Sequence, residues 1–207
     1  MTIEHHPDEE LLLAARSGAA NEAIALLVAT HASLCERCQG IVGDVVAVSA
    51  EPGTVDRVFE SVLARLDATS AAIVRDAHLE SEIPAPLQRY VGMNYDDVPW
   101  RAITSGYSQH RLFEVGETRV RLSRAVHRAP GRTVHTHSGR EWILVLSGGF
   151  SDVNGHYNKG DVLSATRETE HEPIADPGVG CINLTVTEGP LLFRKLMPRI
   201  MGRLFGF

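Results

Sequence analysis

The sequence predicts an α+β protein built from two domains, a small all-α bundle followed by an all-β barrel or sandwich. Three observations lead to this fold class. Apolar residues recur at helical spacing in the first part, short strand-like runs separated by turn residues fill the second half, and prolines interrupt the segment between them. We therefore expect a helical domain at 1–82, a linker at 83–106, a β domain at 107–196 and a tail at 197–207.

Three helices are predicted in the first domain from their end signals. Acidic residues open the first helix, and Ser17-Gly18 closes it. Asn21 is a suitable N-cap for a second helix that runs in one piece toward Gly40, where a left-handed terminus is expected. Thr54 is a suitable N-cap for a third helix, because the apolar positions that follow it keep the 3.6-residue period.

The second half has the pattern of an antiparallel β domain. Turns that contain glycine or proline separate its apolar runs at intervals typical of hairpins, as in a small barrel or sandwich. The tail mixes basic and apolar residues, and we expect it to pack on the β domain. The expected strands are Gln109–Val115, Thr118–His127, Glu141–Leu146, Val162–Ser164 and Ile182–Val186.

Charge and composition argue against several classes of protein. Residues 1–100 carry 6 Lys and Arg against 16 Asp and Glu, whereas residues 101–207 carry 14 against 10. Nucleic-acid affinity depends on neutralising phosphates, so the acidic first half argues against direct nucleic-acid binding. No apolar run approaches the ~20 residues that cross a bilayer, so we expect a soluble, cytoplasmic protein without membrane contact. Three cysteines are too few for a disulfide framework.

The first candidate metal site combines one histidine with two cysteines. Positions i, i+4 and i+7 of an α-helix share one face, so a single helix would project His31, Cys35 and Cys38 together. Zinc prefers four nitrogen and sulfur ligands, and either His5 or His6, folding back from before the first helix, can supply the fourth. The alternatives are core residues without a metal, or a CxxC redox couple.

The second candidate metal site lies in the β domain. His135 and His137 are two residues apart and point to one side of a strand, and a Ser-Gly turn can return Glu141 to the same pocket. A barrel can bring His171 alongside them. Imidazoles with one carboxylate suit a divalent metal, zinc first, with iron, manganese or nickel as alternatives. The competing interpretation is a group of surface histidines.

The run His31-x-x-x-Cys35-x-x-Cys38, with His6 before it, resembles the zinc-binding anti-sigma domain of bacterial anti-sigma factors. The resemblance covers the first domain. It implies a zinc-bound helical bundle in which His6 takes the fourth metal position. It also implies that this bundle binds a group IV (extracytoplasmic-function) sigma factor and keeps it from RNA polymerase.

The second half resembles a cupin. The first cupin motif is matched by His135-x-His137-x-x-x-Glu141 with Gly148 at the expected interval, and the second is matched by the spacing of Gly160 and His171. This resemblance implies an all-β cupin barrel that holds the second metal through those histidines and the glutamate. Four turn positions differ from the usual family residues: Ala129, Thr166, Glu168 and Ala175.

A zinc anti-sigma domain followed by a cupin resembles the ChrR group of anti-sigma factors over nearly the whole chain. The resemblance implies a 1:1 complex with the sigma factor, which is released when the cupin responds to singlet oxygen or related oxidants. Related chains often carry a second cysteine two residues after Cys181, but here the residue is Asn183. We therefore expect Cys181 to be a buried apolar residue and not part of a disulfide switch.

Two other classes of function stay open from the sequence. One is a cupin metalloenzyme, such as a dioxygenase or isomerase, in which the same second-site residues bind the metal and the helices form an accessory domain. The other is a zinc-dependent nucleic-acid binder, which the acidic first half disfavours.

Overall fold

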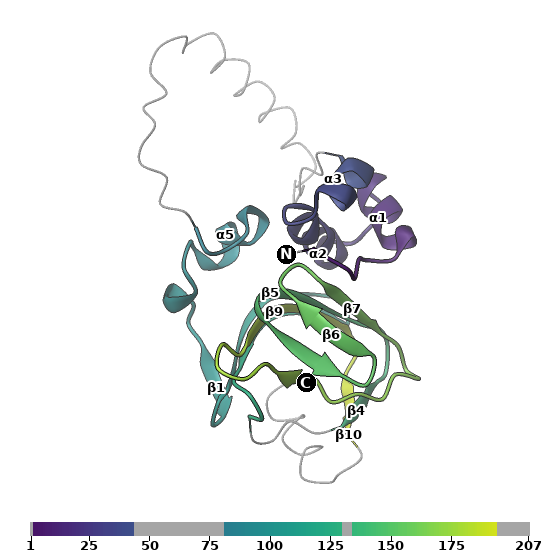
Figure 1. Ribbon diagram of the computed structural model, residues 1–207. Helices are drawn as coiled ribbons and strands as arrows, with labels where there is room; N and C mark the ends of the chain where they lie inside the picture. The colour runs from purple at the N-terminus through teal and green to yellow at the C-terminus, as the bar shows by residue number, and fades with distance from the viewer. Residues whose placement is uncertain (1, 44–80, 130–133, 194–207) are drawn as a thin grey trace, which may run out of the picture.

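The structure is a computed structural model that describes residues 2–43, 81–129 and 134–193. Within these ranges, helices from the N-terminal part lie against a barrel of antiparallel strands (Figure 1). The predicted fold class, a helical part followed by an all-β cupin barrel, is confirmed. The helix predicted after Thr54 and the tail at 197–207 lie outside the described residues. In the described ranges, no helix is long and apolar enough to cross a membrane.

The first two helices begin where their end signals predict. Helix α1 (Glu9–Arg16) has acidic residues in its first turn, and α2 (Glu22–Ala32) is capped by Asn21. The Asn21 side chain accepts a hydrogen bond from the Ile24 N–H at 3.0 Å, which satisfies one of the backbone donors exposed at a helix start.

The second predicted helix is split into two. α2 stops short of Gly40, and α3 (Glu36–Val42) starts after Cys35, which is extended with φ −126°. The prediction of one continuous helix is therefore wrong. The hydroxyl of Ser33, directly after α2, donates to a carbonyl of its last turn at 2.7 Å, and such side chains favour helix ends. The left-handed terminus of α3 is Gly43, with φ 69°, not Gly40.

The segment predicted as a linker, 83–106, contains regular structure and packs on both parts. The Tyr90 hydroxyl donates to the Glu22 carboxylate at the start of α2, at 2.9 Å. The Tyr90 ring stacks on Phe113 of the barrel with the ring centroids 5.2 Å apart. The domain boundaries stay a prediction. The segment holds α5 (Ala85–Val91), the 3-10 helix η1 (Tyr95–Asp97) and β1 (Arg101–Thr104).

The barrel contains each of the predicted strands, although the strand predicted at Thr118–His127 ends at Ala125. Besides β1, its strands are β2 (Tyr107–Val115), β3 (Thr118–Ala125), β4 (His135–His137), β5 (Glu141–Asp152), β6 (Gly155–Asn158), β7 (Val162–Ala165), β8 (Ile174–Ala175), β9 (Cys181–Glu188) and β10 (Leu191–Phe193). An eight-stranded antiparallel sheet has the order β1-β2-β3-β9-β5-β6, with β7 and β8 also paired to β5. β4 and β10 form a separate two-stranded sheet.

A glycine bends β5 between its two sets of partners. Gly148 pairs with Cys181 at the end of the β9 ladder, and the next residue begins the β6 ladder. Gly148 has φ 68°, and a Cβ there would collide with the carbonyl oxygen of Gly180. Only glycine meets both conditions, which explains the residue type at this cupin-motif position.

One hydrophobic core crosses from the helices to the barrel. α2 is buried on almost every side, as expected of a helix that is apolar all round. Its Leu27 side chain belongs to the same buried cluster as Leu122 of β3 and Leu184 of β9. A second cluster, which includes Val145 and Phe150, belongs to the barrel alone. The shared cluster stabilises the helices and the barrel against each other.

Candidate metal centres

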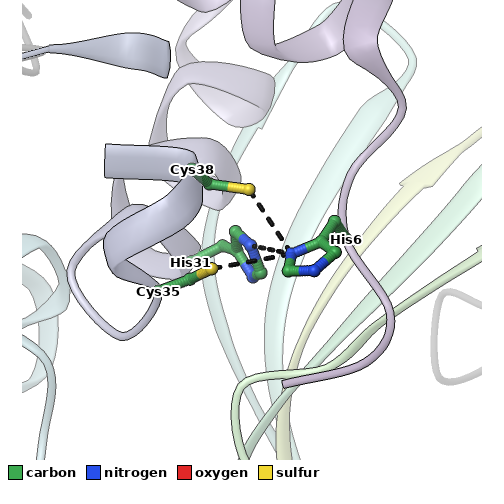
Figure 2. Close-up of side chains that lie close together, drawn as sticks. All are labelled: His6, His31, Cys35 and Cys38. Carbon is green, nitrogen blue, oxygen red and sulfur yellow. Dashed lines mark hydrogen bonds between the residues drawn. The ribbon is translucent and has the colours of Figure 1, made fainter. Parts of the chain in front are cut away.

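Four predicted ligands meet where the N-terminal segment passes the end of α2 and the start of α3 (Figure 2). The His6 Nδ1 atom lies 3.5 Å from Nε2 of His31, 3.5 Å from Sγ of Cys35 and 3.4 Å from Sγ of Cys38. A tetrahedral zinc ion with bonds of about 2.3 Å to sulfur and about 2.0 Å to nitrogen separates neighbouring ligand atoms by about 3.5 Å. The cluster therefore has the spacing of a tetrahedral zinc site.

The break between α2 and α3 brings the helical ligands together. Along one straight helix, residues seven apart are separated by about 10 Å, too far for His31 and Cys38 to share an ion. In the structure His31 lies in the last turn of α2, Cys35 is the N-cap of α3 and Cys38 lies in its first turn. The predicted residues do converge, but a helix–turn–helix replaces the predicted single helix.

The structure decides which of the two adjacent histidines joins this cluster. His6 turns toward His31 and the two cysteines. The neighbouring His5 ring packs on Tyr157 of β6, with centroids 4.6 Å apart. His6 is therefore the histidine in position to be the fourth ligand.

Burial sets the charge state of the first cluster. It lowers the pKa of His31 to about 4, so the imidazole is neutral. The His31 Nδ1–H donates to the Gly160 carbonyl at 2.9 Å, which leaves the Nε2 lone pair facing His6. Burial, followed by the nearby Cys35 sulfur, raises the pKa of Cys38 to about 11. The Cys38 thiol therefore keeps its proton at neutral pH when no ion is bound, and a divalent ion would displace the thiol protons and neutralise the thiolates that result.

The second set of predicted ligands also comes together, inside the cupin. His135 and His137 project from β4, Glu141 begins β5, and His171 lies between β7 and β8. All four are buried, and their ligand atoms lie within 4.8 Å of one another. Glu141 Oε2 is 3.0 Å from Nε2 of His137 and 3.5 Å from Nε2 of His171. Three imidazoles and one carboxylate suit a divalent metal.

Backbone hydrogen bonds join the two cupin motifs. The His135 N–H donates to the His171 carbonyl at 3.1 Å, and the His171 N–H donates to the His135 carbonyl at 3.2 Å. The spacing of the motifs did not predict this pairing. It joins the two chain segments through backbone groups that are not metal ligands.

Each of two cupin imidazoles has an outer hydrogen-bond acceptor. The His171 Nδ1–H donates to the Asp152 carboxylate at 3.0 Å, and the His137 Nδ1–H donates to the Thr166 carbonyl at 3.3 Å. Such partners orient metal-binding imidazoles with Nε2 toward the ion. The sequence analysis did not identify either acceptor. Nothing in the local sequence marks them, because one lies at the far end of β5 and the other is a backbone group.

The carboxylate of Glu141 is held from a further direction. The Thr187 hydroxyl on β9 donates to Glu141 Oε1 at 3.3 Å, and the buried Arg121 guanidinium donates to the Thr187 oxygen at 2.9 Å. Strand register places Thr187 beside Glu141, its partner on β5, and Arg121 lies two residues along β3 from Arg119, the partner of Thr187 on that strand. The sequence analysis also missed it.

Electrostatics favour an ionised carboxylate in the cupin site. Burial alone would raise the pKa of Glu141, but hydrogen bonds from His137 and His171 hold it well below its usual range. Burial alone would lower the pKa of His171, but the Asp152 carboxylate, which accepts its Nδ1–H, and the Glu141 carboxylate, 3.5 Å from its Nε2, raise that pKa to about 9. A bound metal would replace the proton on His171 Nε2.

The remaining histidines and the third cysteine lie outside both clusters. The His127 Nδ1–H donates to a backbone carbonyl at 2.7 Å, and His156 pairs with the Asp176 carboxylate at 3.1 Å. Cys181 is buried, as predicted. His78 lies outside the described residues.

The chain matches known proteins along nearly all of its length. The family model described as the ChrR Cupin-like domain matches residues 88–191. The anti-sigma-E factor ChrR of Cereibacter sphaeroides is 36% identical over 214 residues, which cover 99% of each chain. A chain in the crystal structure of Rhodobacter sphaeroides SigE in complex with the anti-sigma ChrR is 34% identical, with a TM-score of 0.65 over 90% of this chain and 100% of that one. Both of the predicted parts lie within these matches, and this chain belongs to the ChrR family of anti-sigma factors.

Proposed function

We propose that this chain binds a group IV sigma factor in a 1:1 complex in the cytoplasm and keeps it from RNA polymerase. The observation that carries the proposal is the four-residue cluster of His6, His31, Cys35 and Cys38, set in a chain that is similar over its whole length to an anti-sigma factor. A similar chain forms a complex with SigE. The helical part is the proposed binding surface.

Zinc is the metal we propose for the first site. Nitrogen and sulfur donors at tetrahedral spacing are its preferred ligands in structural sites. α1, α2 and α3 are short, and a small bundle gains much of its stability from a bound structural metal. Binding to the sigma factor therefore depends on this metal, because the metal fixes the helices that form the surface.

The cupin site is the proposed sensor of singlet oxygen or related oxidants. Zinc is the first choice for its metal, iron, manganese and nickel also fit the donors, and the bound ion would act as a Lewis acid. The Glu141 carboxylate is 3% exposed and depends on the N–H groups around it. An oxidant-driven change at this centre needs to cost the inhibited complex only about 3 kcal/mol to shift the equilibrium toward released sigma factor by about 100-fold, at about 1.4 kcal/mol per tenfold.

Transcription by RNA polymerase with a group IV sigma factor of the same organism tests the inhibitory role. The wild-type chain is expected to abolish transcription at equimolar ratio, and His31→Ala is expected to restore it. His127→Ala is the matched control, because His127 lies outside both clusters and should leave inhibition intact. Undiminished inhibition by a zinc-free His31→Ala chain would contradict the role of the first site.

Exposure of the preformed complex to a singlet-oxygen generator tests the sensing role. We expect the wild-type complex to release active sigma factor, and the His137→Ala complex to inhibit normally but to release much less. Equal release from both complexes would contradict sensing at the cupin metal. Multiple turnover of a small molecule by the metal-loaded chain would instead support the metalloenzyme alternative.

A further inference from the structure

The N-terminal segment before α1 is attached to the cupin, not only to the helices. The Glu4 and His5 N–H groups donate to Oδ1 of Asp161 at 2.8 Å and 2.9 Å. The Val162 N–H at the start of β7 donates to the His5 carbonyl at 3.0 Å. These three hydrogen bonds fix the backbone directly before His6, which is a ligand of the first cluster.

Asp161 belongs to the turn that joins β6 to β7, and its carboxylate is fully engaged. Its second oxygen, Oδ2, accepts the Asn158 N–H at 2.8 Å. The Asp161 backbone also bonds to Val145 of β5, whose N–H donates to the Asp161 carbonyl at 3.0 Å. The residue is 1% exposed. One buried side chain therefore shapes the cupin turn and holds the N-terminal segment at the same time.

The residue before Asp161 holds a second ligand of the same cluster. The Gly160 carbonyl accepts the Nδ1–H of His31 at 2.9 Å, which directs the His31 Nε2 lone pair toward His6. Gly160 has φ 95°, and a Cβ there would press against Ile3 of the N-terminal segment. Glycine therefore allows the segment to approach the turn closely. Neighbouring residues of one turn thus position both imidazoles.

We propose that the cupin turn Asn158–Asp161 is a functional part of the first metal site, with Asp161 as the positioning residue for His6 and the Gly160 carbonyl as the orienting partner of His31. The inference rests on the proposed function in one respect, that the first cluster binds a divalent metal with affinity for thiolates. The first site then reaches full metal affinity only when the cupin turn is folded in place. Metal affinity in the helical part therefore depends on the conformation of the barrel.

Strand pairing connects this turn to the cupin metal ligands. β7 follows the turn directly and pairs with the start of β5. At one end of this ladder Val162 is the partner of Leu144, and at the other end Ala165 is the partner of Glu141. A displacement of Glu141 would be transmitted to Asp161 through the short β5–β7 pair. This strand pair therefore connects the two candidate metal centres, although they lie in different parts of the chain.

Cobalt titration of the full-length chain tests the inference. Cobalt bound to cysteine gives a thiolate charge-transfer absorption, which reports the first cluster alone because the cupin donors contain no sulfur. Asp161→Ala is expected to weaken cobalt binding at this site by about 10- to 100-fold, as loss of an outer-sphere partner does elsewhere. Asp161→Asn should give a smaller loss, because the amide oxygen still accepts the Glu4 and His5 N–H groups but the amide nitrogen cannot accept from Asn158.

A matched control and the cupin site itself separate positioning from general loss of structure. Asp176→Ala removes a barrel carboxylate that pairs with His156, and it should leave the charge-transfer titration unchanged. Asp161→Ala should still bind one metal at the cupin site. If Asp161→Ala does not fold, Asp161→Asn is decisive, and wild-type affinity in that variant overturns the inference. Wild-type affinity in a folded Asp161→Ala chain also overturns it and leaves the proposed function intact, whereas absence of the charge-transfer band in the wild-type chain contradicts the first metal site itself.

Discussion

The two candidate metal centres differ in how far the protein holds the ligand side chains in place without a metal. The cupin donors come from β4, the start of β5 and a segment tied to β4 by backbone hydrogen bonds, and two of the imidazoles have outer acceptors. The first cluster is assembled from an N-terminal segment and the ends of two short helices, and its outer contacts, from His31 to the Gly160 carbonyl and from the segment before His6 to Asp161, come from the cupin turn and not from the helices themselves. In the cupin the fold positions the metal ligands, whereas in the helical part the metal is expected to hold the fold together.

Loss of a first-site thiol is expected to have the largest effect. Cys38→Ser should remove one zinc ion per chain, melt α1, α2 and α3, and weaken sigma-factor binding by at least about 100-fold, or about 2.7 kcal/mol. Elemental analysis, circular dichroism and a binding titration measure the three quantities. Cys181→Ser is the matched control, since Cys181 is similarly buried but lies outside both clusters. If both variants kept the full zinc content, the comparison between the two centres would fail.

An outer partner in the cupin is expected to affect only the metal. Asp152→Asn removes the negative charge beside the His171 Nδ1–H but leaves an amide oxygen that can still accept it, and metal affinity at the cupin site should fall by about tenfold. The barrel should stay folded, because its core does not depend on the ion. Competition with a chelator measures the affinity, and Asp176→Asn, at the barrel surface, is the control. A barrel that unfolds without its metal would show that the fold does not prepare this site.

Metal uptake by the cupin site is expected to depend on pH in a defined window. Burial would lower the pKa of His171, but Asp152 and Glu141 raise it to about 9. Because the pKa of His171 is higher in the folded state, its protonation stabilises the metal-free fold fully below pH ~6.5, and this stabilisation is lost as the pH rises through about 9. A metal must displace that proton, so affinity should rise about tenfold per pH unit between about 7 and 9 and then level off. A flat profile measured over this range would contradict the protonated His171.

The smallest expected effect separates helix stability from metal binding. Asn21→Ala removes the cap of α2 and should lower the free energy of unfolding by about 1 kcal/mol. The zinc content should not change, because the cap lies at the opposite end of α2 from His31. Thermal unfolding with elemental analysis tests this. Loss of zinc from Asn21→Ala would show that zinc binding at the first site is lost even when α2 is only slightly destabilised.

Local patterns in the sequence predicted much of the site. Ligand spacing identified His31, Cys35 and Cys38 in the first set and His135, His137 and Glu141 in the second, because these residues lie close together in the chain. Spacing left His5 and His6 open, and the family resemblance selected His6. Turn residues predicted the strands. The prediction of one continuous helix from Asn21 toward Gly40 was wrong. The helix breaks at Ser33, whose side chain donates a hydrogen bond to the preceding turn, and helical periodicity did not reveal this break.

Features that depend on packing were not predictable from the sequence. The Asp152 and Thr166 acceptors, the Thr187 contact to Glu141 and the attachment of His5 to Asp161 all join residues that meet only after the strands pair. The burial of α2 between the other helices and the barrel has the same origin. Strand register and the shared core determine these contacts, and neither can be inferred from the residue type at a single position.

Anomalous diffraction at the zinc edge, from crystals of the purified full-length chain, tests the central claim directly. The account predicts a peak between the first four donors, within about 2.0–2.4 Å of His6 Nδ1, His31 Nε2 and the two sulfur atoms of Cys35 and Cys38. Well-ordered helices with no ion between these four atoms would contradict it.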